Sequence, residues 1–595
     1  MTQQIRHSQF VITYGPGAIL EGQGGPRIIP NADVGLFFPN SGRVPDDFEI
    51  SDQRMSQGLL QGARIYRLPS NAEVRVGGNA PLYRTKPFPS WSLCLGDGHG
   101  GDVGILYIGN HCPVCGTQGR RRRESIRFVR ACSAGHLDDV FWPHVVHRNQ
   151  GCNHTEWFRW HGGGGALSQV NIECPQCGQR ANLGQAYGQS WACSGRYPER
   201  EFLGTAPLRP NCNQRAKIIQ RQASNLRIPE LRTLFTIPPR ATRLHNLLQS
   251  SPIISALTAF GLSAITGIDF LGNILNRLAL QRLILPSVVN EILQYQWQEI
   301  REAIGDVLSP VSTSFHDLLR EEFRQLLHAS RNGYPPVRPA PSSPAIFEVN
   351  PASVRAVPFE GGRSIRVTPI SRLQTVTVQV GYRREIAGAG AGAQAGLTSV
   401  SFQDTQNRRW YPGVRFLGEG LFLSFERDNG WHFPLQSAAS EAWLSAGQQA
   451  AGYPNQLFRT GVPDELHPVF VWWHTFAHLL IRSISIDSGY SSAAIRERVY
   501  FEGEPHRARG GVILYATQPG NDGSLGGLIA LVPHFERIFS RAMEMLRVCS
   551  NDPLCSDNHF AVGRYCGPAC YSCLLISETS CEHRNLWLDR GVLLS

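Results

Sequence analysis

Three pairs of closely spaced cysteines are the side chains of this sequence best suited to chemistry. They are Cys112 with Cys115, Cys174 with Cys177, and Cys570 with Cys573. In each Cys-x-x-Cys pair a tight turn directs two thiolates at one tetrahedral ion, which lies about 2.3 Å from each sulfur when it is zinc. A site closed by four protein ligands has no open coordination position. The pattern therefore predicts zinc that stabilises the fold rather than zinc that catalyses a reaction.

The C-terminal cysteines offer more thiolates than one tetrahedral ion needs. They are Cys549, Cys555, Cys566, Cys570, Cys573 and Cys581. The three with the tightest spacing, Cys570, Cys573 and Cys581, are predicted ligands. Cys555 is the predicted fourth ligand, with Cys549 and Cys566 as alternatives.

Two more sites are expected in the N-terminal part. The second of them has the spacing of a closed four-cysteine zinc ribbon. Its predicted ligands are Cys174, Cys177, Cys193 and Cys212.

In the first N-terminal site, Cys112 and Cys115 need two further ligands. The candidates are Cys94 with His99, Cys132 with His136, and Cys152 with His154, the last pair serving whichever site is left over. Cys94 and Cys132 are taken as the expected ligands beside the Cys112–Cys115 pair. A redox role for that pair is the rival interpretation, but no thioredoxin-like βαβ pattern surrounds it.

The distribution of cysteines also bears on the redox compartment. All 15 cysteines fall between residues 94 and 212 or between 549 and 581. A secreted disulfide scaffold is usually short and follows a signal peptide, whereas residues 1–7 lack an apolar signal core. We therefore predict a cytoplasmic protein whose reduced thiolates hold roughly two to four zinc ions.

Arginine dominates the basic residues. The formal net charge is +10, and only two basic residues, Lys86 and Lys217, are lysines. Guanidinium groups grip phosphate, so a run of four arginines is a candidate contact to a nucleic-acid backbone. The run is Arg120, Arg121, Arg122 and Arg123. A solvated charge run or a contact to a partner protein is the alternative.

The shortage of lysine excludes one class of motor. A P-loop needs a Gly-Lys-Ser/Thr sequence to hold the nucleotide phosphates. Lys86 is followed by Pro87, and Lys217 by Ile218. We therefore predict that this chain is not a P-loop ATPase and not an enzyme.

His474 and His478 lie four residues apart on one face of a predicted helix, a spacing that binds zinc in metalloproteases. The general-base glutamate of those enzymes is missing, because Thr475 occupies its position. Packed or hydrogen-bonded helix histidines are the favoured interpretation, and a metal-dependent hydrolase or nuclease using His474 and His478 is the alternative. The glycine-rich turn at residues 520–527 is a weaker candidate, for phosphate binding.

Periodicity predicts an α+β multidomain chain with a β-rich, zinc-ribbon-like N-terminal part, a helical centre, a further β-rich segment and a C-terminal α/β domain with a cysteine-rich zinc site. The central helical pattern includes Leu318 and Phe323, and residues 253–275 form the most apolar stretch. Asp269 and Asn273 interrupt that stretch, which favours buried helices over a membrane span. The predicted regions are 1–90 (rich in Gly and Pro), 91–235 (zinc-binding), 236–333 (helical), 345–440 (β-rich) and 460–595 (C-terminal zinc-binding). A proline-rich linker is predicted at 334–344.

The C-terminal region resembles the cysteine-rich domain at the end of MrfA-type DNA helicases. In that family a Cys-Pro-Ser-Cys knuckle and a later cysteine bind structural zinc, and Cys570, Cys573 and Cys581 match these positions. Tyr571 replaces the usual proline.

The rest of the chain resembles the DrmB family of the DISARM anti-phage defence system. The segments that carry the resemblance are Ser8–Phe10, Tyr14–Gly17, Arg127–Val129, Cys132, Gly135–Asp139, Ala223–Asn225 and His474–His478. The family tends to have a second close cysteine near Cys94, where this chain has His99 at a longer spacing.

The resemblance implies a heterodimer with a DrmA-like helicase of superfamily 2, which holds the ATPase motors. The complex would engage phage DNA through contacts to the DNA backbone. This chain would then be a non-catalytic accessory subunit that supports DNA binding and translocation. A stand-alone DNA-binding module is the remaining alternative.

Overall fold

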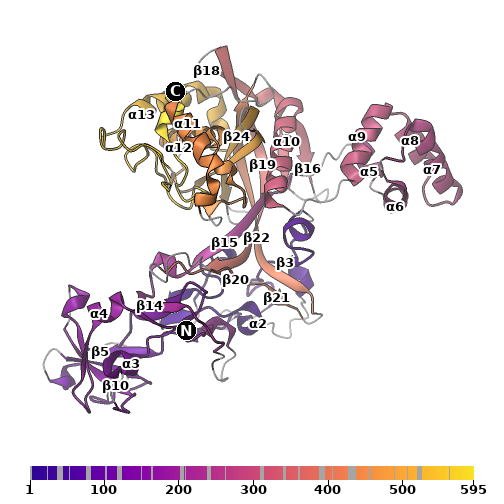
Figure 1. Cartoon of the computed structure of the whole chain (residues 1–595). Helices are drawn as coiled ribbons and strands as arrows, with labels where there is room; N and C mark the ends of the chain where they lie inside the picture. Colours follow the sequence, from indigo (N-terminus) through magenta and orange to yellow (C-terminus); the bar gives the residue numbers. More distant parts are fainter. Residues whose placement is uncertain are drawn as a thin grey trace. The chain divides into compact units, whose positions relative to one another are not determined.

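The computed structural model (Figure 1) describes residues 3–594 except 23, 37–44, 53, 76–81, 101–102, 117–122, 149–150, 163–164, 202–206, 208, 238–242, 249, 262, 309–313, 339–343, 360–361, 387–395, 405–406, 427–436, 454–456, 488–489, 505–506, 519–525 and 562. The described residues form two compact units, each assembled from three separate segments. Unit 1 comprises residues 1–52, 63–233 and 376–415, and unit 2 comprises 53–62, 234–375 and 416–595. Helices and sheets are mixed in a multidomain chain, which confirms the predicted fold class.

Unit 1 contains three separate sheets. The first has the order β1 (Ile19–Gly22), β2 (Gly25–Ile28), β4 (Lys86–Pro87). The second has the order β12 (Arg180–Asn182), β11 (Asn171–Glu173), β10 (Trp157–His161), β6 (Val103–Ile108), β5 (Trp91–Cys94), β7 (Arg123–Ser125). The third has the order β13 (Ser190–Ala192), β14 (Arg215–Gln220), β8 (Phe128–Cys132), β9 (Leu137–Asp139). These short strands with intervening turns present the cysteine-bearing loops.

The remaining elements of unit 1 are short. They are α1 (His7–Ile12), α2 (Ala32–Gly35), β3 (Arg64–Tyr66), α3 (Trp142–His147), α4 (Leu183–Gly188), β20 (Thr398–Ser399) and β21 (Phe402–Gln403). A tryptophan-rich core lies beside the second sheet, with Trp142, Phe158 and Ile172 fully buried in it. Along β10 the buried residues Phe158 and Trp160 alternate with more exposed neighbours, as expected for a strand with one face on a core.

Three strands each have some residues in unit 1 and some in unit 2. They are β15 (Ile228–Phe235), β19 (Arg363–Arg383) and β22 (Arg409–Phe425). The unit 2 sheet follows the order β16 (Tyr334–Val337), β17 (Phe347–Val349), β19, β22, β24 (Arg507–Gln518), β23 (Ile495–Glu504), and β18 (Arg355–Phe359) also pairs with β19. The prediction of a linker at 334–344 is wrong for its first four residues, because Tyr334–Val337 form β16. An edge strand tolerates Pro335 and Pro336, whose missing N–H groups need no partner on the open side.

Helices cover both faces of the unit 2 sheet (Figure 1). They are α10 (Phe315–Asn332), α11 (Ala438–Gln448), α12 (Pro468–Asp487), α13 (Phe535–Arg547) and α14 (Arg590–Leu593). Side chains alternate between the faces of a strand, so Val512 and Leu514 pack in the core that contains α12, whereas Ile513 packs in the core that contains α10. The sheet thus holds α12 and β23 in one core, and the C-terminal cysteines pack against the same core.

The central helices form their own core. They are α5 (Arg243–Leu248), α6 (Ser251–Phe260), α7 (Ile268–Leu280), α8 (Pro286–Leu293) and α9 (Trp297–Leu308). Leu257, Leu271 and Leu275 are fully buried among them, so the most apolar stretch of the sequence forms two core helices, as predicted. Among the described helices, α12 is long and apolar enough to cross a membrane by length and composition alone. Its apolar window is 83% buried inside the protein, which makes it a core helix here.

Candidate metal centres

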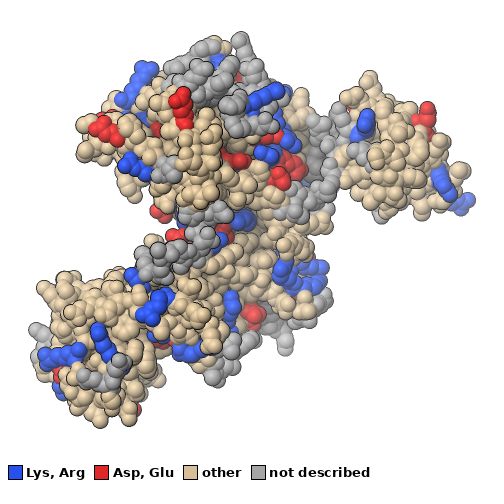
Figure 2. All heavy atoms as spheres, viewed as in Figure 1, with Lys and Arg blue, Asp and Glu red and all other residues tan. Residues whose placement is uncertain are grey.

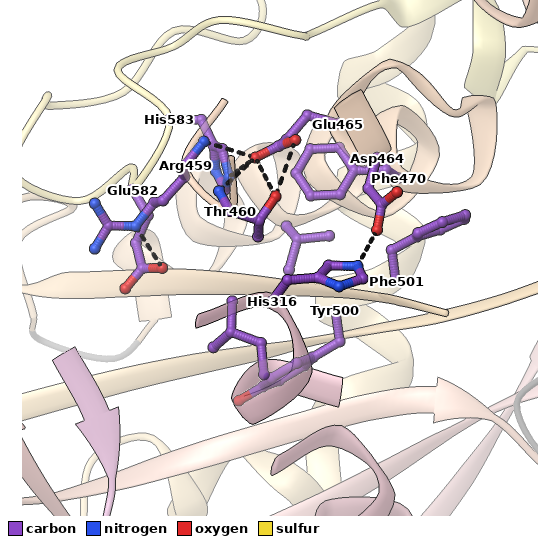
Figure 3. Close-up of a pocket in the computed structure, with 12 residues that line it drawn as sticks. His316, Arg459, Thr460, Asp464, Glu465, Phe470, Tyr500, Phe501, Glu582 and His583 are labelled. Carbon is purple, nitrogen blue, oxygen red and sulfur yellow. Dashed lines mark hydrogen bonds and ion pairs between the residues drawn. The ribbon is translucent and has the colours of Figure 1, made fainter. Parts of the chain in front are cut away.

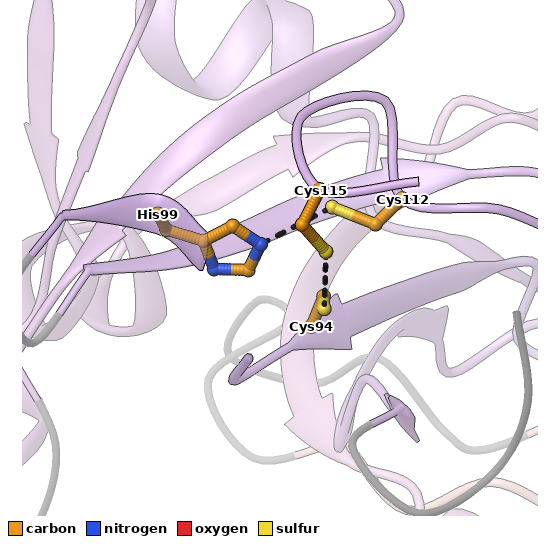
Figure 4. Close-up of side chains that lie close together, drawn as sticks. All are labelled: Cys94, His99, Cys112 and Cys115. Carbon is orange, nitrogen blue, oxygen red and sulfur yellow. Dashed lines mark hydrogen bonds between the residues drawn. The ribbon is translucent and has the colours of Figure 1, made fainter. Parts of the chain in front are cut away.

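The first group of metal-ligating side chains is built on β5 and β6 (Figure 4). Cys94 is the last residue of β5, His99 ends a short 3-10 helix, and Cys112 and Cys115 lie in the turn after β6. The sulfur atoms of Cys94 and Cys115 are 3.8 Å apart, and Cys112 Sγ lies 3.3 Å from His99 Nε2. Two sulfur ligands of one tetrahedral zinc ion are also about 3.8 Å apart. The four ligand atoms therefore fit one ion.

The hydrogen bonds and burial around this group favour the binding of a cation. The Nδ1–H of His99 donates to the carbonyl oxygen of Val103 at 3.1 Å, which leaves Nε2 with its lone pair towards Cys112. Burial raises the pKa of the Cys94 thiol to about 11. A bound divalent ion offsets that cost, because the thiolate is the form that ligates metal.

The second group lies on the sheet formed by β13, β14 and β8. Its members are Cys132, His136, Cys193 and Cys212. Cys132 Sγ is 3.5 Å from Cys193 Sγ and 3.3 Å from His136 Nδ1. The hydrogen bond to Cys132 and burial together raise the pKa of the Cys193 thiol to about 12. These thiols would therefore form thiolates on binding a metal ion rather than in its absence.

The third group joins the end of α3 to the Cys174 knuckle. Its members are His147, Cys152, Cys174 and Cys177, and the Cys152 and Cys174 sulfur atoms are 3.9 Å apart. His147 Nε2 is buried and has no hydrogen-bond partner among the described residues. A buried imidazole nitrogen rarely lacks a partner, and a metal ion would supply one.

The fourth group lies in the C-terminal cysteine zone. Its members are Cys549, Cys555, Cys570 and Cys573. The sulfur–sulfur distances are 3.4 Å from Cys549 to Cys570, 3.7 Å from Cys570 to Cys573, and 3.8 Å from Cys573 to Cys555. Burial opposes ionisation of Cys570, but hydrogen bonds from Cys549 and from backbone N–H groups lower its pKa to about 6. The set is a closed four-thiolate site, which stabilises a fold and leaves no position for a substrate.

The structure groups the N-terminal ligands differently from their spacing along the chain. Cys193 and Cys212 join Cys132 rather than Cys174 and Cys177, because β13 and β14 pair in one sheet with β8. Sequence spacing does not reveal this pairing, since Cys132 and Cys193 are 61 residues apart.

Two consequences follow for the other N-terminal groups. With Cys132 in its own group, His99 completes the set around Cys94, which was one of the alternatives considered. His147 completes the set around Cys152, and it was missed. Its only sequence signal is a histidine shortly before Cys152. His154 instead has its Nε2 2.7 Å from the carbonyl oxygen of Trp157.

At the C-terminus the structure separates Cys581 from the knuckle. Cys549 takes the place expected for Cys581, beside Cys570 and Cys573. The turn after Cys573 carries Cys581 back against α12, where its Sγ lies 3.2 Å from His474 Nε2. His474 and His478 are fully buried. A hydrolase needs substrate access to its metal, so this burial argues against the hydrolytic alternative.

Two other candidates fall largely outside the described residues. Arg120, Arg121 and Arg122 are not described, and Arg123 is the first residue of β7 with no description of its side chain. Most of the glycine-rich turn at 520–527 is likewise outside the described residues.

A small pocket in unit 2 has its own network of charged side chains (Figure 3). His316 Nε2 lies 2.5 Å from Asp464 Oδ2, and Arg459 Nε lies 3.4 Å from Glu582 Oε2. Burial raises the pKa of Glu465 to about 7, although backbone N–H groups donate to its carboxylate. These contacts join α10, the segment before α12 and the C-terminal loop.

Comparison with known proteins supports the metal assignment. Residues 476–574 match the MrfA Zn-binding domain, a span that contains the whole fourth group. Residues 6–228 match a domain of unknown function, DUF8724, a span that contains the first three groups. The prediction of structural zinc is confirmed by the Zn-binding match and by cysteine–histidine groups of compatible composition.

The chain is also similar to a DISARM protein. It is 27% identical over 542 residues to the DISARM protein DrmB of Bacillus paralicheniformis, which covers 85% of this chain and 88% of that protein. The resemblance expected from the sequence segments is thereby confirmed: the chain is similar to DrmB along most of its length and carries an MrfA Zn-binding domain in its C-terminal part.

Proposed function

We propose that this chain is a non-catalytic, zinc-stabilised accessory subunit of a DISARM-type defence complex, and that it pairs with a separately encoded DrmA-like helicase in the cytoplasm. The observation that carries the proposal is the similarity to DrmB over 85% of the chain. The lack of a Gly-Lys-Ser/Thr sequence at Lys86 and Lys217 supports it, because a subunit without a P-loop needs a partner to supply ATP-driven movement.

The four cysteine-rich groups suit a scaffold rather than an enzyme. Each is closed by four protein ligands, so a zinc ion would fix loops that have little apolar surface of their own. The C-terminal domain is of the kind that ends MrfA-type helicases, where it is fused to the motor. In this chain the same kind of domain would act on a motor in trans.

Association with the helicase is the direct test of this function. Both proteins are expressed together with a tag on the helicase alone, purified, and analysed by size-exclusion chromatography. Co-elution in one peak is expected, at a mass equal to one copy of each chain. Separate elution, with this chain folded and loaded with zinc, would contradict the proposed partnership.

DNA contact is the second part of the proposal. On the face shown in Figure 2, the described lysine and arginine side chains lie in small groups rather than in one broad patch, some of them beside acidic side chains. A run of four adjacent arginines in the sequence would add a denser contact for phosphate. We therefore assign backbone contact to Arg120, Arg121, Arg122 and Arg123.

Removing two of these charges should weaken DNA binding without changing sequence preference. For the double variant Arg120→Gln/Arg121→Gln, the slope of log affinity against log salt should fall by up to about 1.8. The matched control is Arg277→Gln/Arg301→Gln, which removes two exposed charges from the central helices. Fluorescence anisotropy with duplexes of two unrelated sequences measures both. Equal slopes for the two double variants would count against the assignment.

A further inference from the structure

A fifth group of side chains differs in composition from the other four. His474 and His478 come from α12, Glu497 from β23, and Cys581 from the C-terminal loop. Their ligand atoms lie within 4.8 Å of one another, and no side chain of the four is more than 5% exposed. Two nitrogens, a carboxylate and a sulfur therefore converge inside the core of unit 2.

Both imidazoles are held by their outer nitrogens. His478 Nδ1 lies 3.0 Å from the carbonyl oxygen of Leu574, and His474 Nδ1 lies 3.3 Å from that of Trp587. A carbonyl only accepts, so each Nδ1 carries the proton and each Nε2 presents a lone pair inward. Metal-bound histidines are oriented in this way, with the second ring nitrogen donating to a backbone carbonyl or a carboxylate.

The inward atoms lack sufficient partners without a cation. His478 Nε2 and Glu497 Oε2 are buried and have no hydrogen-bond partner among the described residues. His474 Nε2 lies 3.3 Å from Glu497 Oε1 and 3.2 Å from Cys581 Sγ. Burying a carboxylate and unpaired lone pairs is unfavourable, and a coordinated ion would offset that cost.

The sulfur is presented as a thiolate ligand would be. The backbone N–H groups of His583 and Asn585 both donate to Cys581 Sγ, each at 3.3 Å. Arg584 and Asn585 have positive φ angles of 55° and 59°, which folds the backbone around the sulfur. Burial and the neighbouring Glu497 carboxylate raise the pKa of the Cys581 thiol, and the two N–H donors only partly oppose that shift, so a bound cation would favour the thiolate.

We propose that His474, His478, Glu497 and Cys581 bind one divalent ion in a closed structural site. Imidazole, carboxylate and thiolate together suit Zn²⁺, which accepts nitrogen, oxygen and sulfur in a tetrahedral arrangement. The ion would fasten α12 to β23 and to the C-terminal loop. Through the bond from His478 to Leu574, it would also brace the residue that follows Cys573 of the four-cysteine group.

Metal content tests this site directly. Wild-type protein is passed through metal-free buffer, and zinc per chain is measured by plasma mass spectrometry and by native mass spectrometry. Five ions are expected when the four cysteine-rich groups are loaded. Cys581→Ser and Glu497→Gln should each lower the count by one. Cys566→Ser is the matched control and should leave five, because Cys566 belongs to none of the groups in the described part of the chain and its thiol contacts the carbonyl oxygen of Asn585.

Two outcomes would overturn the site. One is a wild-type count of four, which needs no variant and so remains decisive if the substitutions prevent folding. The other is a soluble Cys581→Ser protein with the wild-type count. Cobalt substitution adds an independent readout, because Cys581→Ser should remove the thiolate-to-cobalt absorption of one ion, whereas Cys566→Ser should keep it.

Discussion

Replacing Cys573 with serine should remove one zinc ion per chain and unfold the C-terminal cysteine zone. Cys573 lies 3.7 Å from Cys570 and 3.8 Å from Cys555, sulfur to sulfur, so its loss opens the four-thiolate set. Loss of a structural metal is among the few single changes that destabilise a protein by more than about 4 kcal/mol. Zinc analysis together with limited proteolysis measures the effect, and rapid cleavage between residues 549 and 581 is expected.

The matched control for this prediction is again Cys566→Ser, in the same zone. It should keep the wild-type zinc count and resistance to protease. The account of the fourth group would be contradicted by a Cys573→Ser protein that retains both. A loss of helicase association in Cys573→Ser, with association kept in Cys566→Ser, would further connect the zinc site to the proposed partnership.

The second large effect is expected at Arg498, a fully buried residue of β23. Its guanidinium bonds Glu322 at 2.8 Å and Glu582 at 2.8 Å, and lies over the ring of Phe235. Arg498→Ala would leave the fully buried carboxylate of Glu322 without this cation and Glu582 with Arg459 alone, at a cost of about 3–5 kcal/mol. Because the chain has more than one domain, the effect is best measured locally. Hydrogen exchange of the amides in β23 and β24 should speed up about a hundredfold or more, since about 1.4 kcal/mol corresponds to a factor of ten.

A control variant and a rescue variant test whether the loss of the buried ion pair causes the faster exchange. Arg496→Ala removes a partly exposed arginine two residues earlier on the same strand and should change exchange little. The triple variant Arg498→Met/Glu322→Gln/Glu582→Gln removes the charges together, and much of the protection should return. Exchange in Arg498→Ala as slow as in the wild type would show that the ion pair does not stabilise this sheet.

The cysteine knuckles themselves could be predicted from the sequence, but their complete ligand sets could not. A Cys-x-x-Cys pair is a local signal because one turn places both sulfur atoms. The other two ligands arrive through tertiary structure: Cys132 meets Cys193 only because β8 and β14 are neighbours. Spacing alone therefore paired Cys193 and Cys212 with Cys174 and Cys177, whereas the structure brings them to Cys132 and His136.

The histidine and glutamate ligands of these groups are harder to predict from the sequence than the cysteines. His147 ends a short helix, and Glu497 lies within an ordinary strand, so neither has a local motif. His474 and His478 have a spacing that can bind metal, but the glutamate of a metalloprotease is missing between them, which favours packed or hydrogen-bonded histidines over a metal site. Their partners, Glu497 and Cys581, lie on other elements, and burial decides that the group is closed.

The fold class is easier to predict from the sequence than the division of the chain into two units. Helical spacing predicted a helical centre, and alternation predicted a further β-rich segment after it. The two compact units are each built from three distant segments, and β19 and β22 contribute residues to both. Long-range strand pairing of this kind leaves no periodic trace in the sequence.

We propose that this chain supplies no ATPase motor and instead assists a separately encoded helicase. The most direct test is DNA-dependent ATP hydrolysis by the DrmA-like helicase, measured with and without this chain at two salt concentrations. We predict no hydrolysis by this chain alone and a higher turnover by the helicase when both are present. Hydrolysis by this chain alone, or a helicase turnover unchanged by its zinc-loaded form, would contradict the account.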